Sequence, residues 1–281
     1  MKNFYIITNE EKDPGLALTE EIRRHLVSRG CVCAVRGTAK IPDRERSYRY
    51  TDAGKIPEGV DCVLVLGGDG TLLQASRDLV GTGLPLLGIN LGTMGFLAQI
   101  DREGIYDALG RLLSGKYSVE ERMMLDGIVT GGDGRETKDL ALNDIVIMRR
   151  GKMHLVELKI SVDGSYLCTY RADGIIASTP TGSTGYSLSA GGPVISPAAS
   201  LILLTAVAPH TLNSRPVVLP DDVKVTVEIG GRGETAVSFD GDPEIPLSPG
   251  SRIEITRSAL KTRLIRINET SFVEQLRNKM K

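Results

Sequence analysis

The feature that most constrains this fold is an apolar segment that leads directly into a glycine-rich loop. Residues 62–66 are all apolar, within a strand expected at 60–66, and Gly67-Gly68-Asp69-Gly70-Thr71 follows at once. A strand that is apolar at successive positions is typical of a parallel sheet covered on both faces. A helix is expected immediately afterwards, at 71–79. This order of strand, loop and helix predicts an α/β domain.

Strand-like and helix-like segments alternate over the first 120 residues. Further strands are expected at 4–8, 31–35 and 84–89, and further helices at 13–29 and 105–113. The first of these helices has Asp13 and Pro14 at its start and Gly30 at its end, which are typical boundary residues. We therefore predict a Rossmann-like, open parallel sheet with helices on its faces.

The second half of the chain is β-rich. Strands are expected at 140–148, 155–162, 165–170, 223–229 and 253–256. Asp163-Gly164 favours a type I′ hairpin turn, and residues 269–280 return to helical periodicity. The predicted fold class is α/β plus β, with an N-terminal domain at 1–120 and a β-sandwich-like domain at 121–252. A C-terminal segment at 253–281 is expected to return its helix to the first domain.

Composition excludes several classes of protein. Lys and Arg total 34 against 35 Asp and Glu, a net charge of −1, which argues against binding to nucleic acid or to an anionic membrane. Four cysteines show no CxxC or zinc spacing, and three of them lie in apolar runs, as expected of buried thiols in a reducing compartment. No signal peptide or spanning segment is evident, so a cytoplasmic location is predicted. Glycine alone is over-represented, at 32 of 281 residues.

The first glycine-rich loop has the composition of a phosphate cradle. Glycines let backbone N–H groups approach phosphate oxygens, and the following helix adds its N-terminal dipole. The loop is not a Walker A sequence, because no GxxxxGK[ST] follows. A plain tight turn, in which Asp69 caps the helix, is an equally simple interpretation of Gly-Gly-Asp-Gly alone.

Three further segments favour the binding interpretation. Residues 88–97 form a second glycine-rich loop after the next strand, at the same sheet edge, although it could be a simple crossing into the second domain. Asn143-Asp144 could hydrogen-bond a ribose or an adenine, or form a turn before a strand. Residues 170–193 are dense in Gly, Pro and hydroxyl residues. Their apolar flanks favour a site for a flat ligand over a linker.

Together, Gly67–Thr71, residues 88–97, Asn143-Asp144 and residues 173–193 resemble the NAD kinase family, whose enzymes phosphorylate NAD with ATP to give NADP. The resemblance covers essentially the whole chain. Gly-Gly-Asp-Gly is also found in diacylglycerol, sphingosine and 6-phosphofructo kinases, whereas Asn143-Asp144 and Thr-Pro-Thr-Gly-Ser-Thr at 179–184 are specific to NAD kinases.

The resemblance implies roles for individual residues. Asp69 is the expected proton acceptor for the 2′-hydroxyl of the adenosine ribose, with Gly67, Gly68, Gly70 and Thr71 beside it. Asn143 and Asp144 are expected to hold adenine and ribose. His154, Arg171 and Asp173 match dinucleotide contacts, made within one subunit or from a neighbouring one. The expected lining of the adenosine pocket is Thr184, Gly185, Tyr186, Ser187, Leu188 and Ser189.

Two positions depart from the family pattern. Gly185 stands where an alanine is common, and Asp242 stands where a glutamine is frequent. A carboxylate cannot donate the hydrogen bond of that glutamine. The resemblance also implies ATP and NAD as substrates, and a homodimer or homotetramer. Because no Walker lysine is present, Mg²⁺ or another divalent cation is expected to offset the charge of the ATP.

Several alternatives stay open on the sequence alone. Another kinase of the superfamily, acting on a lipid or sugar alcohol, would need a greasy pocket and no Asn143-Asp144. A non-catalytic dinucleotide sensor would have no need of a proton acceptor at Asp69. The basic segment at 36–55 is interpreted as a solvated loop, with a lid over a polyanionic ligand as the alternative.

Overall fold

The computed structural model describes residues 1–36, 51–151, 154–211, 214–231, 233–242, 244–267 and 271–279. The chain divides into two compact units. Unit 1 comprises Met1–Glu121 and Lys261–Lys281, and unit 2 comprises Arg122–Leu260. Most of the basic segment predicted to be a loop, residues 37–50, lies outside the described residues. The predicted domain boundaries stay a prediction.

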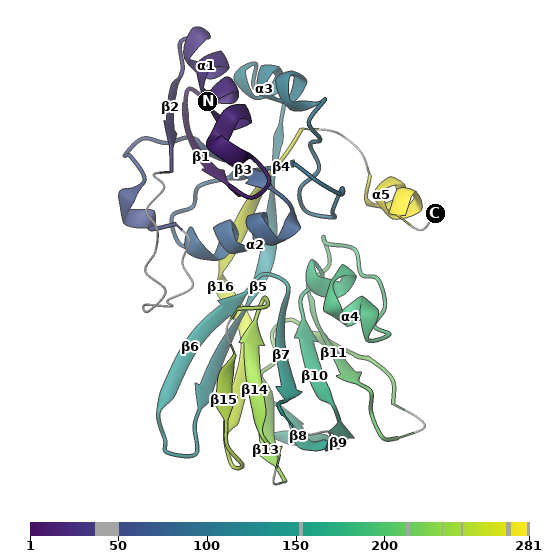
Figure 1. The fold of residues 1–281 in the computed structure, drawn as a ribbon. Helices are drawn as coiled ribbons and strands as arrows, with labels where there is room; N and C mark the ends of the chain where they lie inside the picture. Colours follow the sequence, from purple (N-terminus) through teal and green to yellow (C-terminus); the bar gives the residue numbers. More distant parts are fainter. Residues whose placement is uncertain are drawn as a thin grey trace. The chain divides into compact units, whose positions relative to one another are not determined.

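The sheet of unit 1 is parallel (Figure 1). Its strands are β1 (Asn3–Thr8), β2 (Val32–Val35), β3 (Cys62–Gly67) and β4 (Leu86–Asn90), in the order β2-β1-β3-β4. All residues of β3 and β4 are buried. Leu264, near the end of β16 (Arg252–Arg266), pairs in parallel with Leu86 of β4. The predicted open parallel sheet is confirmed.

Helices cover both faces of this sheet. On one face, α1 (Ala17–Ser28) and α3 (Ile105–Leu113) pack with alternate strand residues such as Phe4 and Ile6 in one core. On the other face, α2 (Asp69–Asp78) packs with Tyr5 and Ile7 in a second core. Because successive side chains of a strand point to opposite faces, an apolar strand needs cover on both sides.

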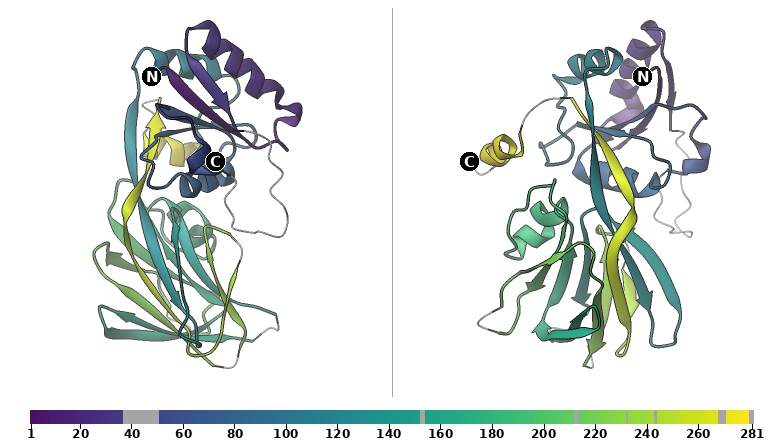
Figure 2. Two further views of the ribbon diagram at one scale, coloured as in Figure 1. Left: turned by 90° about the vertical axis from the view of Figure 1, so that its left-hand side faces the viewer. Right: turned by 180° about the vertical axis from the view of Figure 1, so that it is seen from behind.

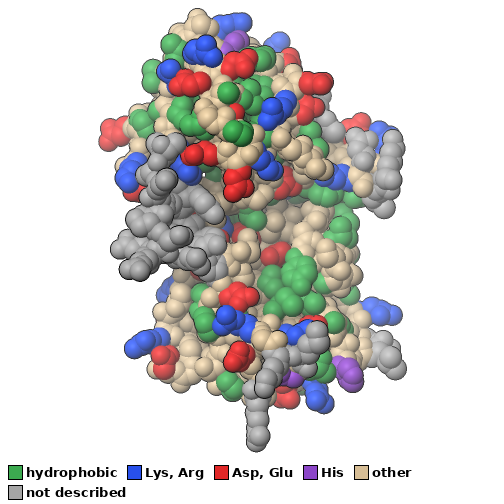
Figure 3. All heavy atoms as spheres, in the orientation of Figure 1, with side chains coloured by type: hydrophobic (Ala, Val, Ile, Leu, Met, Phe, Trp, Pro, Cys, Tyr) green, Lys and Arg blue, Asp and Glu red, His purple; other side chains and the backbone are tan. Residues whose placement is uncertain are grey.

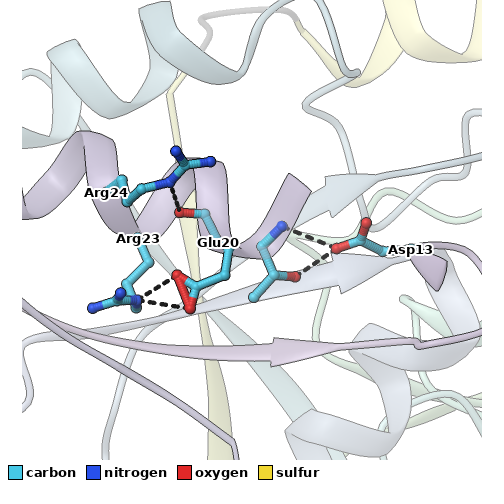
Figure 4. A network of polar contacts seen from close by, with 5 residues as sticks. Asp13, Glu20, Arg23 and Arg24 are labelled. Atoms are coloured by element: carbon cyan, nitrogen blue, oxygen red, sulfur yellow. Dashed lines mark hydrogen bonds and ion pairs between the residues drawn. The ribbon is translucent and has the colours of Figure 1, made fainter. Parts of the chain in front are cut away.

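The start of α1 differs from the prediction. The sequence predicted a helix from Asp13 with Pro14 in its first turn, but Pro14–Leu16 form a separate 3-10 turn and α1 begins at Ala17. Gly15 and Leu16 have positive φ angles, which break the helix. The buried Asp13 carboxylate instead accepts a hydrogen bond from Leu18 N. It accepts two more from Thr19 N and Thr19 Oγ1, which Figure 4 shows.

These hydrogen bonds favour the ionised form of Asp13. Burial alone would raise the pKa of Asp13, but the hydrogen bonds from Thr19 and Leu18 outweigh burial and lower the pKa. Within α1, Glu20 pairs with Arg23 at 2.6 Å on the exposed surface (Figure 4). Such an exposed pair contributes little to stability. The buried Asp13 carboxylate, with its three hydrogen bonds, is therefore the more important contact for the stability of this helix start.

Unit 2 is a sandwich of antiparallel strands (Figures 1 and 2). One sheet has the order β12-β11-β10-β7-β14-β15. Its strands are Val217–Pro220, Leu201–Val207, Gly174–Ser178, Asp144–Arg149, Thr235–Phe239 and Ile245–Leu247. Between β10 and β11 lie a 3-10 turn at Gly182–Thr184 and the short helix α4 (Tyr186–Ser189).

The second layer has the strand order β16-β13-β8-β9, in which β13 is Val225–Gly230, β8 is Val156–Val162 and β9 is Ser165–Ala172. The strand β5 (Ser118–Thr130) pairs with β16 and with β6 (Glu136–Ala141). One apolar core contains side chains from both layers, including Ile147, Ile175, Leu158 and Val227. The predicted β-sandwich-like region is confirmed.

Two predicted strands differ in extent. The strand predicted at 140–148 is two strands, β6 and β7, separated at Leu142 and Asn143. The strand predicted at 253–256 is the middle of the 15-residue β16. The predicted hairpin turn is present, with positive φ at both Asp163 and Gly164.

The C-terminal helix α5 spans Phe272–Lys279, as the periodicity predicted. Its Lys279 ammonium contacts the carbonyl of Met94 and lies 5.1 Å from the ring centroid of Phe96, both in the second glycine-rich loop of unit 1. The four cysteines are all free thiols. Among the helices described, none combines the length and apolar character needed to cross a membrane. On the face shown in Figure 3, acidic and basic side chains are interspersed over each unit.

Candidate active site

The two glycine-rich loops lie together at one edge of the unit 1 sheet. Strands β3 and β4 pair in parallel, with Gly67 opposite Asn90 at their carboxyl ends. Leu91 N donates to Gly67 O at 2.7 Å, which ties the second loop to the first. Ligands of open parallel sheets bind at this edge. The predicted convergence of the two loops is therefore present.

The Asp69 carboxylate holds the second loop. Its Oδ2 accepts a hydrogen bond from Phe96 N at 2.7 Å, and its Oδ1 accepts from Leu97 N at 3.2 Å and Ala98 N at 2.9 Å. Asp69 is also the first residue of α2, where the helix dipole favours a negative charge. An ionised carboxylate has about four acceptor positions. Within the described part of the chain, Oδ2 therefore retains an acceptor position for a ligand hydroxyl.

Glycine is required at two positions around Asp69. A β-carbon at Gly95 would overlap the Asp69 carboxylate, and one at Gly67 would overlap the side chain of Thr71. Thr71 itself receives Gly68 N and Asn9 Nδ2, each at 3.4 Å from its Oγ1. Gly95 thus allows close packing between the two loops, and Gly67 allows close packing within the first loop; neither is needed for an unusual backbone angle.

Two residues of this site were missed from the sequence. Asn90 is buried, accepts Gly92 N at 2.8 Å and donates to Thr93 O at 2.7 Å, so its side chain shapes the second loop. The exposed Lys12 places its ammonium 2.9 Å from where a β-carbon of Gly68 would lie and 3.4 Å from that of Gly92. Lys12 lies 56 positions before Gly68 in the sequence, so no local motif links it to the loops.

In unit 2, Asn143 and Asp144 lie at the point where β6 ends and β7 begins. Asp240 Oδ2 accepts Leu142 N at 2.7 Å, and its Oδ1 accepts Asn143 N at 2.7 Å and Asp144 N at 3.0 Å. Because these three N–H groups face a carboxylate, they do not enter a strand ladder. This explains why the predicted strand is divided here.

The side chains of this pair are largely removed from water. Burial, and secondarily the neighbouring Asp240 carboxylate, raise the pKa of Asp144 to about 7. Asn143 Oδ1 is buried without a hydrogen-bond partner in the described part of the chain. A buried acceptor of this kind is costly unless a ligand or a water satisfies it. The pair is therefore suited to polar recognition.

The segment rich in Thr and Gly packs directly on Asn143. Thr179 N donates to Asn143 O at 2.9 Å, and Thr179 Oγ1 donates to Leu142 O at 2.6 Å. A β-carbon at Gly182 would overlap the Asn143 backbone, whereas one at Gly185 would lie 3.7 Å from Asn143 Nδ2 and from Asp144 Oδ2. The structure thus brings Gly185 to the predicted Asn-Asp pair.

The other residues predicted in this segment differ in exposure. Ser187 is buried, and its Oγ lies 2.9 Å from Thr205 Oγ1, so it packs inward. Thr184 Oγ1 donates to Thr181 O at 3.3 Å. Tyr186 and Leu188 are 40% and 42% exposed, unusually high for large apolar side chains, and Ser189 is also exposed. The Tyr186 hydroxyl lies 3.2 Å from Met148 Sδ.

His154, Arg171 and Asp173 form a separate group. Asp173 follows β9, His154 precedes β8, and Val156 pairs with Ala172 at that end of the two strands. Asp173 forms an ion pair with Arg149 at 2.7 Å, at the far end of β7 from Asp144. Strand β10 runs beside β7 from Gly174, next to Asp173, to Ser178, which is opposite Asp144. At about 3.4 Å per residue, this length of strand separates the Asp173 group from the Asn143-Asp144 pair by roughly 14 Å. The structure does not bring these three residues to Asn143.

Comparisons with known proteins cover both units. Residues 4–117 match the ATP-NAD kinase N-terminal domain, and residues 142–267 match the ATP-NAD kinase C-terminal domain. The chain belongs to the NAD kinase family. This confirms the resemblance, and with it the expectation that the chain is an enzyme, a phosphotransferase.

Individual NAD kinases are similar to this chain over essentially their full length. The chain is 41% identical to the NAD kinase of Lachnospira eligens, with 100% of both chains covered, and 42% identical to that of Agathobacter rectalis, with 100% and 99% covered. Among solved structures, yeast NADH kinase with NADH has a TM-score of 0.85 at 28% identity, covering 100% of this chain and 87% of that one. An Archaeoglobus fulgidus NAD kinase with ATP has a TM-score of 0.79 at 25% identity, covering 98% and 97%.

Proposed function

We propose that this chain transfers the terminal phosphoryl group of ATP to the 2′-hydroxyl of the adenosine ribose of NAD, giving NADP and ADP. Its membership of the NAD kinase family across both units carries the proposal. The bound molecules named for two similar structures, NADH and ATP, support both substrates.

In this proposal, Asp69 orients the hydroxyl and accepts its proton at Oδ2, the oxygen that receives only Phe96 N in the described part of the chain. The ribose 2′-oxygen forms a bond to the γ-phosphorus while the bond from that phosphorus to the bridging oxygen breaks, and the electron pair leaves with ADP. The transition state is loose, so positioning and charge neutralisation dominate. Asp69 receives the proton late, as the new bond develops.

The negative charge of ATP needs partners. Among the described residues of unit 1, the backbone N–H groups at the start of α2 and the ammonium of Lys12, near Gly68 and Gly92, are suited to phosphate. Within the described residues, no three His, Cys, Asp or Glu side chains come together as a metal site. Mg²⁺ is accordingly proposed to arrive as part of the Mg–ATP substrate, held chiefly by phosphate and water.

The dinucleotide is proposed to bind through unit 2. Asn143 and Asp144, beside Gly185, would supply polar contacts to adenine and ribose, and Thr184–Ser189 would line the same pocket. A second group comprises His154, Arg171 and Asp173. It would contact another part of the same dinucleotide, or a dinucleotide bound to a neighbouring copy of the chain. A homodimer or homotetramer and a cytoplasmic location stay predictions.

The direct test is NADP formation from NAD and ATP, read by a coupled NADP-specific dehydrogenase. We expect turnover that disappears when Mg²⁺ is omitted. If NAD binds but no NADP forms with ATP, the chain is a dinucleotide sensor or uses another phosphoryl donor. If NAD neither binds nor reacts, the proposal is wrong and alcohols of lipids or sugars become the substrates to test.

A further inference from the structure

We propose that Asp240 is a positioning residue of the dinucleotide site, because its carboxylate fixes the backbone that carries Asn143 and Asp144. This inference rests on the proposed function, since these two side chains are the proposed contacts to adenosine. Asp240 lies directly after β14 and is almost one hundred positions from the pair in sequence. It would touch neither substrate itself.

The hydrogen bonds give Asp240 this role. Three consecutive backbone N–H groups, of Leu142, Asn143 and Asp144, donate to its two carboxylate oxygens at 2.7–3.0 Å. In return, Asp240 N donates to Asp144 O at 2.9 Å. Hydrogen bonds to an ionised acceptor are stronger than those between neutral groups. The segment is therefore held from one side by a single side chain.

The backbone at Asp240 is adapted to this arrangement. Its φ angle is +54°, in the left-handed region that few non-glycine residues adopt. Phe239, the residue before it, still pairs with Ile145 in the ladder between β14 and β7. The left-handed turn thus ends the ladder and directs the carboxylate to the three N–H groups. An unusual backbone angle of this kind is a reason to look for a functional constraint.

An asparagine cannot replace this carboxylate. Its side-chain oxygen could accept two of the three N–H groups, but its NH₂ group would face the third donor. Asp240→Asn therefore keeps the size of the side chain and leaves a buried N–H without an acceptor. The segment is expected to shift, and with it the Asn143 and Asp144 side chains.

The chain contains a matched control. Asp163 also has a positive φ angle, of 49°, also precedes a glycine, and its Oδ1 also accepts a backbone N–H, that of Lys224 at 2.8 Å. It lies in the exposed hairpin turn between β8 and β9, within the same unit. Asp163→Asn therefore reproduces the chemical change in a turn that carries no proposed contact.

The experiment compares the parent, Asp240→Asn and Asp163→Asn in NAD titrations and steady-state kinetics. We expect Asp240→Asn to weaken NAD binding and raise the KM for NAD by about ten-fold or more, with the KM for ATP within about two-fold of the parent. Asp163→Asn should match the parent in both. Equal NAD binding by parent and Asp240→Asn would overturn the inference, and so would an equal rise in both KM values.

A measurement on the parent decides the case if Asp240→Asn does not fold. Scalar couplings across hydrogen bonds, from the amide nitrogens of Leu142, Asn143 and Asp144 to the carboxyl carbon of Asp240, should be observable by NMR, and their absence would overturn the inference. If the parent binds no NAD, the proposed function fails. The couplings then still decide whether Asp240 fixes the segment.

Discussion

The Asp69 carboxylate occupies the space that a β-carbon at position 95 would need, so any larger residue at position 95 would displace the proposed proton acceptor. Three N–H groups of Phe96, Leu97 and Ala98 hold the same carboxylate. The second glycine-rich loop is thus organised around Asp69. This contact links the first glycine-rich loop to the second.

Gly95→Ala should therefore impair catalysis. The new methyl group must displace the carboxylate, and misplacement of a reacting group by about 1 Å can cost about 100-fold in rate. We expect kcat to fall by about ten-fold or more in steady-state assays. Gly110→Ala is the control within the same unit, because no atom lies within 4 Å of where its β-carbon would be. Equal kcat values for the two variants would contradict the role of this contact.

Lys12→Met should weaken the use of ATP. The substitution keeps an unbranched side chain but removes the positive charge between Gly68 and Gly92. A charge-assisted hydrogen bond contributes about 1.5–3 kcal/mol, so the KM for ATP should rise by about ten-fold or more. The KM for NAD should change less. An unchanged KM for ATP would show that Lys12 does not contact the phosphates.

The pH dependence of stability should carry the signature of Asp144. Its pKa is raised to about 7 in the folded protein, from a model-peptide value near 3.9, so the folded state binds the additional proton between these values. Stability is therefore lost as pH rises from about 4 through 7, with a maximal slope of about 1.4 kcal/mol per pH unit.

Asp144→Asn should remove this contribution. Denaturant unfolding of parent and variant at a series of pH values from 5 to 8 measures it, and the difference between them should grow in favour of the variant as pH rises. A difference that is constant with pH would show that Asp144 is ionised throughout.

Two glycines of unit 1 should respond oppositely to alanine. Gly110 is an exposed residue within α3, and no atom lies within 4 Å of where its β-carbon would be. Gly110→Ala should raise the free energy of unfolding by about 0.5–1 kcal/mol. Gly115 has equally open surroundings but a φ of +74°, so Gly115→Ala should lower it by about 1 kcal/mol. Thermal unfolding of both variants provides the check.

The helices, strands and turns whose signals lie in neighbouring residues of the sequence were predictable. The apolar run of β3, the amphipathic α3 and the Asp163-Gly164 hairpin carry their signals in adjacent residues. The start of α1 was predicted incorrectly, because Gly15 and Leu16 adopt left-handed backbone angles after Pro14. Nothing in the proline signal itself distinguishes a 3-10 turn from a helix.

The contacts that organise the candidate site were not predictable in the same way. Asp69, Asn143 and Asp144 were named from motifs, but the groups that hold them, the N–H groups of residues 96–98 and the Asp240 carboxylate, are distant in sequence. The division of the predicted strand at Leu142 depends on Asp240, about one hundred residues later. Such contacts become visible only when the fold brings the segments together.

The most direct test of the account is ³¹P NMR of the product that parent and Asp69→Asn form from NAD and Mg–ATP. Asp101→Asn is the control, because the exposed Asp101 carboxylate also accepts a backbone N–H, that of Gly104 at 2.8 Å. We predict a 2′-phosphate of the adenosine ribose from the parent and the control. Asp69→Asn should bind NAD but lose about 100-fold or more in rate. Turnover of Asp69→Asn at the parent rate, or a phosphate at another position, would contradict the account.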